Sequence, residues 1–318
     1  MYNGVINVYK EKGYTSFDVV AKLRGILHQK KIGHTGTLDP DAEGVLVVCL
    51  GSATKLCEIL TDKDKSYEAT LLLGKTSDTE DSSGKILTEC DVTVSPKEVE
   101  QAILSFVGEY AQIPPMYSAI RVNGRKLYEL AREGKEIERE PRMVSIQQIE
   151  ILSMDLPKVT FKVSCGKGTY IRSLCRDIGE KLGCGGLMDS LVRNSVNSTE
   201  TGKVFTKEDA LTLDEIEQLV KSGNIEDKIY PIDSLFPGLT KVKVCGEGIK
   251  KLANGNILRS GELHLLHQSD ASSGKDMIHN MEKEGMQCLV YNADNVFTAI
   301  YQYNRKIKAW KAEKMFLS

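Results

Sequence analysis

The sequence predicts an α+β protein in which one large domain is followed by a small β-rich domain. Three observations favour this fold class. The chain has 318 residues, which is long for a single domain. Apolar residues recur at helical spacing in some segments and alternate or run together in others, without a simple repeat. From residue 241 to residue 318, short apolar runs are broken by Gly and Asn, as is typical of short strands and turns.

The first half of the chain predicts a helix and two strands. A capping box of Thr15 and Asp18 begins the helix. The predicted apolar face of this helix consists of Phe17, Val20, Leu23 and Leu27. The apolar run Val45–Leu50, closed by Gly51, predicts a buried strand. Tyr67–Leu73 predicts another strand, which ends at Gly74.

The second half predicts further helices before the small domain. Ser95, Pro96 and Glu98 begin a helix that ends before Gly108. Its predicted buried face consists of Val99, Ala102, Ile103 and Phe106. The later predicted elements are the half-buried strand Val159–Cys165, the helices Ile171–Leu182 and Thr206–Gly223, the linker Tyr230–Thr240 and a mobile loop at Ser269–Lys275.

Composition indicates a globular protein of the cytoplasm. Hydrophobic residues make up 41% and charged residues 27% of the chain, both ordinary values. No stretch approaches the ~20 apolar residues that span a bilayer, and the N-terminus lacks the pattern of a signal peptide. The eight cysteines form no CxxC pair, so we expect reduced core thiols rather than a metal site.

The segment Gly33–Gly44, GHTGTLDPDAEG, is the strongest candidate for a functional loop. It combines three glycines and one histidine with the alternating acids Asp39, Asp41 and Glu43. Two interpretations compete with a catalytic carboxylate on this loop. The alternating acids resemble the start of a calcium loop, but Leu50 stands where the bidentate Glu is required. The acids could also simply be solvated on a glycine-rich turn.

The functional loop is one of four long segments that can be compared together with known families. They are GHTGTLDPDAEGVL and, further along the chain, Lys65–Ile86, Ile113–Gly134 and Lys167–Gly186. In this order they resemble the motifs of the TruB family, the bacterial tRNA pseudouridine-55 synthases, and the first is similar to the family's catalytic motif. The resemblance covers most of residues 1 to 235. Four long motifs in the same order are far more specific than any single short pattern.

The resemblance implies the architecture and the reaction. A pseudouridine synthase catalytic domain with a mixed, mainly antiparallel sheet and RNA-gripping insertions is expected over residues 1–235. A small PUA-like RNA-binding domain is expected over residues 241–318. The implied activity is isomerisation of the uridine at position 55, in the TΨC loop of tRNA, to pseudouridine. The base is flipped out of the loop first, and no redox cofactor, nucleotide or metal is implied.

The resemblance also implies the residues of the site. Asp39 matches the family's nucleophile, Arg172 the arginine that binds this carboxylate, and Tyr67 the aromatic residue that stacks on the target base. Tyr170 matches a second aromatic residue of the pocket and Leu191 a leucine that packs against the uracil.

His34 matches a histidine that holds the RNA open. Without the resemblance, the residue types alone would equally fit a core tyrosine, a solvated arginine and a structural histidine. One departure from the family is Leu191-Val192-Arg193, which lacks one basic residue of the usual Leu-Arg-Arg.

The predicted partner is the T-arm stem-loop of tRNA, although the net charge is −2 and the pI about 6.3. Two basic clusters could contact phosphates. The first lies around the third motif and comprises Arg121, Arg125, Lys126, Arg132, Arg139 and Arg142. The second is C-terminal and comprises Arg305, Lys306, Lys308, Lys311 and Lys314. The acidic tracts Asp78–Asp81 and Glu133–Glu140 are predicted to lie away from the RNA.

Two other functions fit the same segments. One is a tRNA-folding chaperone with a vestigial site, and the other is a guide-RNA-dependent synthase subunit. The chain has no long basic tail that would indicate assembly into a ribonucleoprotein. We expect a monomer without an obligatory protein partner and without a membrane partner. Other catalytic patterns fail: Ser52–Lys55 fits SxxK without its companion motifs, and no HExxH, GxSxG or GxGxxG occurs.

Overall fold

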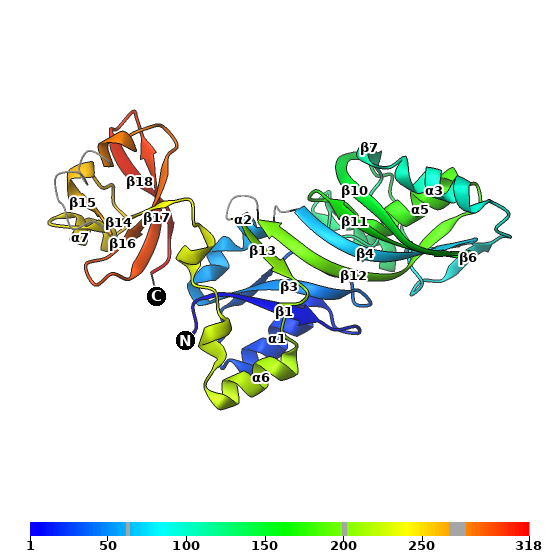
Figure 1. Cartoon of the computed structure of the whole chain (residues 1–318), viewed down its shortest axis with the longest axis horizontal. Coiled ribbons are helices and arrows are strands. Elements are labelled where there is room, and N and C mark those ends of the chain that lie inside the picture. Colours follow the sequence, from blue (N-terminus) through cyan, green and yellow to red (C-terminus); the bar gives the residue numbers. More distant parts are fainter. Residues whose placement is uncertain (62–63, 199–201, 267–277, 318) are drawn as a thin grey trace.

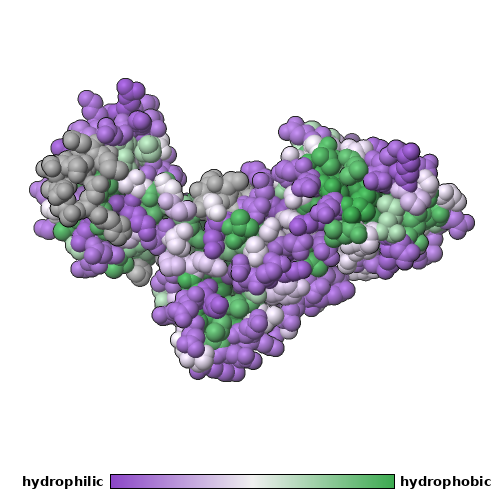
Figure 2. All heavy atoms as spheres, in the orientation of Figure 1, coloured by the Kyte–Doolittle hydropathy of each residue, from purple (hydrophilic) through white to green (hydrophobic). Residues whose placement is uncertain are grey.

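The computed structural model describes residues 1–61, 64–198, 202–266 and 278–317. A long, twisted sheet forms the body of the molecule, and a smaller sheet forms a separate C-terminal domain beside it (Figure 1). In the space-filling view, the surface is hollowed between this small domain and the part of the body farthest from it (Figure 2). Figure 1 shows β10 (Arg142–Asp155), β11 (Lys158–Cys165), α3 (Pro96–Leu104) and α5 (Ile171–Lys181) in that part. Within the described residues, no helix is long and apolar enough to cross a bilayer.

Among the described residues, nine strands form the large sheet. Its central path runs through β1 (Gly4–Lys10), β3 (Glu43–Leu50), β12 (Gly186–Ser198), β4 (Asp64–Leu73), β11 (Lys158–Cys165), β10 (Arg142–Asp155) and β7 (Gly108–Gln112). Off this path, β2 (Ile32–Thr35) pairs with β3 and β13 (Lys203–Thr206) pairs with β12. Only β3 and β12 pair in parallel among these described strands, which confirms the expected mixed, mainly antiparallel sheet.

Helices cover the sheet at both ends. The longer ones are α1 (Ser16–Ile26), α3 (Pro96–Leu104), α5 (Ile171–Lys181) and α6 (Leu213–Ser222). The short ones are η1 (Gly51–Leu56), α2 (Cys57–Thr61), α4 (Leu127–Arg132), η2 (Ile225–Lys228) and η3 (Ile232–Leu235). The predicted capping boxes at Thr15 and Ser95 are both present and begin α1 and α3. In Figure 1, α1 and α6 lie together below β1, while α3 and α5 lie near β10 and β11.

Alternation along β1 and β3 divides the core between the two faces of the sheet. Ile6 and Val8 face a cluster formed with α1 and α6, whereas Val5 faces the opposite side. A third cluster joins β4, β10, β11, β12 and α5 around Phe161.

An insertion at residues 113–141 has a small apolar core of its own around Leu127. It contains α4 and the hairpin of β8 (Arg121–Val122) and β9 (Arg125–Lys126). A second hairpin joins β5 (Lys75–Ser77) and β6 (Ile86–Glu89).

The C-terminal domain confirms the expected β-rich pattern. Its sheet contains, in spatial order, β15 (Leu263–Leu265), β14 (Thr240–Val244), β16 (Gln287–Tyr291), β17 (Phe297–Asn304) and β18 (Ala309–Met315). The short helices α7 (Gly248–Ala253) and η4 (Ser260–Glu262) lie between β14 and β15 along the chain. Leu289 and Phe316 of this domain share a buried cluster with Leu235 and Phe236 of the body. The two domains therefore have a common apolar interface.

Four sequence expectations differ from the structure. Phe17 is 64% exposed, because α1 buries Val19 together with Val20 and Leu23. The predicted helix Thr206–Gly223 is shorter, since Thr206 ends β13 and Thr212 caps α6.

The predicted helix face at Val99 also stops earlier than expected, since α3 ends at Leu104 and Phe106 is only partly buried. The predicted linker Tyr230–Thr240 is packed, with η3 inside it and Phe236 buried. The predicted mobile loop Ser269–Lys275 lies outside the described residues.

Candidate active site

Glycines shape the loop that carries Asp39. This loop joins β2 to β3, and Gly36 within it has φ +77°, a left-handed conformation that favours glycine. Gly44 has φ +101°, and a Cβ there would lie 2.3 Å from the carbonyl oxygen of Arg193 on β12. β3 and β12 approach closely at this point, so only glycine fits. The loop therefore leaves the sheet at a fixed position.

Three side chains hold the loop by its backbone. The Ser16 hydroxyl accepts from the Leu38 amide (2.9 Å) and donates to the Leu38 carbonyl (3.2 Å). Lys10 Nζ donates to the Pro40 carbonyl at 3.0 Å. The guanidinium of Arg193 donates to three carbonyls, those of Val45 (2.6 Å), Gly36 (3.1 Å) and Thr37 (3.5 Å). Because all three side chains are buried, these bonds are shielded from competing water and fix the loop.

Arg172, at the start of α5, binds the Asp39 carboxylate with two prongs. Its Nε lies 2.9 Å from Asp39 Oδ2, and its Nη2 lies 3.3 Å from Oδ1. The guanidinium also donates to the carbonyls of Thr79 and Tyr117, each at 2.9 Å. The Arg172 side chain is only 6% exposed, whereas that of Asp39 is 37% exposed. The arginine is therefore a buried anchor, and the carboxylate is presented to solvent in a fixed direction.

Asp81 completes this charge cluster and was missed in the sequence. Its Oδ2 lies 3.8 Å from Arg172 Nε, with 15% of the side chain exposed. The acidic tract Asp78–Asp81 was expected to lie away from the RNA; in the structure, its Asp81 lies against the arginine that binds the candidate nucleophile. No local signal distinguishes Asp81 from Asp78, because its role depends on the approach of α5.

Tyr67 and Leu191 lie on one apolar wall. Across the β4–β12 pair, Tyr67 is opposite Arg193, and Leu191 is opposite Ala69. Directly opposed and alternate residues share a face of a sheet, so these side chains point the same way. Tyr67 and Leu191 belong to the same cluster as Leu38, the residue before Asp39. Burial raises the pKa of Tyr67 to about 12, so its ring is neutral at physiological pH.

Tyr170 and His34 lie at the borders of this arrangement. Tyr170 precedes α5, and its backbone amide and carbonyl bind the Gln112 side chain at 2.8 and 3.0 Å. His34 stands on β2, with Nδ1 buried and without a hydrogen-bond partner among the described residues. Burial, followed by the charge of Arg193, lowers the pKa of His34, so the neutral ring is favoured.

Lys10 and Arg193 are two further residues for which the sequence indicated no role. Arg193 stands in the stretch that departs from the family's usual Leu-Arg-Arg; in the structure it is fully buried and donates to backbone carbonyls of the Asp39 loop. Lys10 is also fully buried and ends a strand whose alternate residues Ile6 and Val8 are core. The alternation of this strand places Lys10 on its buried face, and this pattern could have indicated a structural role. Burying an ammonium group is costly unless it has hydrogen-bond partners.

We expect Lys10 to make folding stability depend on alkaline pH. Burial lowers the pKa of Lys10 from 10.5 to about 8. Between those values the unfolded chain binds the proton more tightly than the folded one, so stability rises with pH. Relative to Lys10→Met, the wild-type free energy of unfolding should increase by about 1 to 2 kcal/mol between pH 8 and pH 10. Denaturant titrations of both proteins measure this difference, and a constant difference would contradict the shift.

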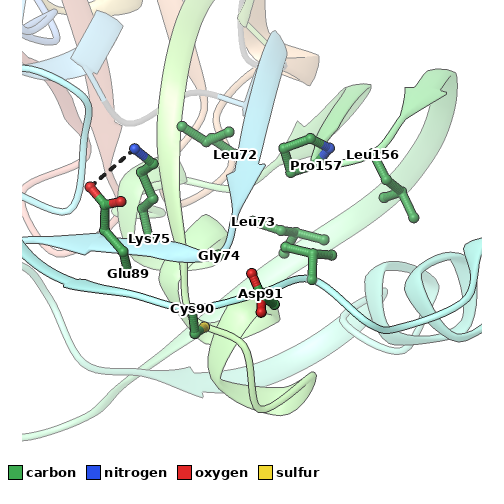
Figure 3. Close-up of a pocket in the computed structure, with 10 residues that line it drawn as sticks. Leu72, Leu73, Gly74, Lys75, Glu89, Cys90, Asp91, Leu156 and Pro157 are labelled. Atoms are coloured by element: carbon green, nitrogen blue, oxygen red, sulfur yellow. Dashed lines mark hydrogen bonds and ion pairs between the residues drawn. The ribbon is translucent and has the colours of Figure 1, made fainter.

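A pocket of about 460 Å³ lies away from the Asp39 loop, at the C-terminal end of β4 (Figure 3). It is lined by Leu72, Leu73, Gly74, Lys75, Glu89, Cys90, Asp91, Val92, Leu156 and Pro157. Lys75 and Glu89 form an ion pair there at 3.1 Å. None of the six candidate residues lines it, and at ~3.3 Å per strand residue Leu73 is roughly 20 Å along β4 from Tyr67. No cluster of three His, Cys, Asp or Glu side chains suited to a metal ion occurs in the described part of the chain.

Comparison with known families identifies the class of protein as pseudouridylate synthases, enzymes that isomerise uridine to pseudouridine. Residues 24–171 match the model of the TruB family pseudouridylate synthase N-terminal domain. Residues 172–237 match that of the tRNA pseudouridylate synthase B C-terminal domain. The chain belongs to the TruB family. The second match ends before β14, so the small C-terminal sheet lies beyond both models.

Similar proteins span nearly the whole chain. The "tRNA pseudouridine synthase B" of Lachnoclostridium phytofermentans is 53% identical, over 99% of this chain and 100% of its own length. That of Alkaliphilus oremlandii is 47% identical, over 89% and 91%. A solved structure of an H/ACA RNP bound to a substrate RNA contains a chain with 25% identity and a TM-score of 0.66. The match covers 99% of this chain and 85% of that one.

Proposed function

We propose that this enzyme converts the uridine at position 55, in the TΨC loop of tRNA, to pseudouridine. The similar proteins named tRNA pseudouridine synthase B, with up to 53% identity, support tRNA as the substrate class. The four motif segments of the sequence support the T-arm as the recognised part. A single-stranded loop suits the chemistry, because its bases can be splayed out and read individually.

The observation that carries the proposal is the two-pronged contact between Asp39 and Arg172. The guanidinium stabilises the ionised carboxylate and aims it, while 37% of the Asp39 side chain remains exposed to an incoming nucleotide. Attack on C6 of the base, attack on C1′ of the ribose and removal of a ribose proton all require this ionised carboxylate. In each case the N1–C1′ bond breaks, the uracil turns, and C5 bonds to C1′; C5 then loses its hydrogen as a proton, and N1 gains one.

The surrounding residues take the roles that a flipped base requires. Tyr67 stacks on the uracil with its neutral ring, and Leu191 packs against the base from the same wall. Tyr170 lines the pocket beside Arg172, and His34 helps to hold the loop open after nucleotides leave the stack. Base flipping costs a few kcal/mol, which contacts with this apolar wall and Asp39 offset.

The two domains divide the work between chemistry and RNA binding. We assign catalysis to residues 1–235, including the RNA-gripping insertions, and RNA binding to a PUA-like domain at residues 241–318. The basic residues Arg305, Lys306 and Lys308 are exposed at the β17–β18 turn, where they are available to phosphates. The enzyme works in the cytoplasm, as a monomer, without a metal, a cofactor or an obligatory protein partner.

Neutralising the β17–β18 turn should weaken tRNA binding without slowing the chemistry. We expect Arg305→Gln, Lys306→Gln and Lys308→Gln together to raise the Kd at least about tenfold and to flatten its salt dependence. The single-turnover rate at saturating enzyme should stay within about twofold. Substitution is preferable to truncation, because removing the domain would expose Leu235 and Phe236 of the shared cluster.

The matched control removes three exposed lysines of the body, on α1, α6 and η2, with Lys22→Gln, Lys221→Gln and Lys228→Gln. Filter binding at several salt concentrations measures both triple variants. Equal weakening by the two variants would show that only net charge matters, and would remove the RNA-binding role of the C-terminal domain.

Tritium release from C5-labelled uridine tests the proposed function. Purified protein is mixed with an unmodified tRNA transcript, or with its T-arm stem-loop alone, without other proteins. Release of one tritium per tRNA is the expected result. Binding without release would favour a tRNA-folding chaperone. Release only after addition of a guide RNA and partner proteins would favour a ribonucleoprotein subunit. The structural similarity to a chain of an H/ACA RNP is the reason for testing this alternative.

A further inference from the structure

Two arginines one turn apart on α5 bind the same pair of segments. The first segment is the turn at residues 78–82, called here the Asp81 turn, and the second is the insertion at residues 113–141. Arg172 donates to one backbone carbonyl in each. Arg176 repeats this pattern: it forms an ion pair with Glu80 of the Asp81 turn and donates to the Ile113 carbonyl at 3.1 Å. Because residues i and i+4 lie on one helix face, the two sets of contacts are stacked.

Glu80 is an unusual residue for its position. Its φ is +64°, in the left-handed region where a side chain is strained and glycine is favoured. Both of its carboxylate oxygens are engaged, one by Arg176 and the other by the Ser173 hydroxyl at 2.7 Å. The Glu80 side chain is 11% exposed and that of Arg176 is 17% exposed. The side-chain contacts with α5 therefore hold a backbone conformation that the residue type itself disfavours.

The Asp81 turn is also tied to the strand that carries Leu191. The Met188 amide of β12 donates to the Glu80 carbonyl at 3.0 Å, and the Ser82 amide donates back to the Met188 carbonyl at 2.9 Å. The turn is thus fixed between α5 and β12. The same turn supplies the Thr79 carbonyl and the Asp81 carboxylate that lie against Arg172. A shift of the turn would move the partners that aim this guanidinium at Asp39.

We propose that Glu80 and Arg176 are positioning residues for the pseudouridylation reaction. Their contacts hold the Asp81 turn and Ile113, the first residue of the insertion, against α5. In this way they set the direction of the Arg172 guanidinium. Neither residue touches the Asp39 carboxylate, and their effect passes through Thr79, Asp81 and Arg172. The inference rests on the proposed function, since it concerns the rate of that reaction.

Glu80→Gly separates positioning from stability. Glycine relieves the left-handed backbone, which offsets part of the stability lost with the ion pair, but it frees the turn from α5. We expect the single-turnover rate of pseudouridine formation to fall about tenfold or more. The Kd for tRNA should stay close to that of the wild type, and the loss of rate should persist at temperatures well below the melting temperature of the variant. A purely structural residue would change the melting temperature and leave the rate of the folded enzyme intact.

His28→Gly is the matched control. His28 also has a left-handed φ, +49°, and it is exposed after the end of α1, away from Arg172. Glycine at this position relieves a left-handed backbone in the same way, and it should leave the single-turnover rate of pseudouridine formation unchanged. Arg176→Gln and the double variant with Glu80→Gly complete a thermodynamic cycle. If the two residues act as one clamp, the double variant should be no slower than the slower single variant.

The outcomes separate this inference from the proposed function. Wild-type protein that releases no tritium would overturn the proposed function itself. A different pattern would overturn only the positioning role. In it, the wild type is active, Asp39→Asn is inactive, and Glu80→Gly reacts at the wild-type rate. Multiplicative losses in the double variant would also overturn it, since they would show two independent effects.

Discussion

Replacing Asp39 with Asn is expected to abolish pseudouridine formation while tRNA remains bound. Asparagine keeps the volume of the side chain and most of its hydrogen bonding, but it removes the negative charge and the nucleophilic oxygen. Turnover should fall below detection in the tritium assay. The Kd for tRNA should change by less than about tenfold, or ~1.4 kcal/mol, because RNA affinity comes mainly from phosphate contacts.

Asp41→Asn and Glu43→Gln are the controls on the same loop. Neither carboxylate belongs to the contacts described around Arg172, and both variants should keep substantial activity. Equal losses at all three acids would indicate a bound cation in place of a nucleophile. An Asp39→Asn enzyme that modifies tRNA at nearly the wild-type rate would falsify the assignment of Asp39.

Arg172→Lys should be nearly as damaging, although it conserves the charge. The guanidinium binds both oxygens of Asp39 and also the carbonyls of Thr79 and Tyr117. A lysine ammonium cannot reach these groups in a planar array, so buried carbonyls lose their donors and Asp39 loses its direction. We expect the single-turnover rate to fall at least about a hundredfold, or ~2.7 kcal/mol in the barrier.

Arg24→Lys is the matched control for that substitution. Arg24, on α1, also donates from Nε to a backbone carbonyl, that of Lys30 at 3.1 Å, but it is remote from Asp39. Its replacement should leave both rate and affinity unchanged. A mild effect of Arg172→Lys, comparable with that of Arg24→Lys, would mean that a point charge suffices, and it would contradict the two-pronged role.

Local sequence determined those features whose causes lie within a few residues. The capping boxes at Thr15 and Ser95 each join a side chain to a backbone amide three residues away, so their residue types alone predict the helix starts. The buried strand at Val45–Leu50 and the shaped loop around Asp39 follow from an apolar run and from glycines at fixed positions. The ordered motifs predicted the family as well, because they extend over most of residues 1 to 235.

The environment of the site was decided only by tertiary structure. Asp39 and Arg172 are 133 positions apart, and their contact depends on β12, which pairs with β3 and packs against α5. Asp81 resembles any acid on a polar turn until α5 brings Arg172 to it. Lys10 and Arg193 become anchors because packing removes them from water next to backbone carbonyls. Sequence patterns report hydrogen bonds and periodicities within a segment, whereas desolvation and charge pairing depend on which distant segments meet.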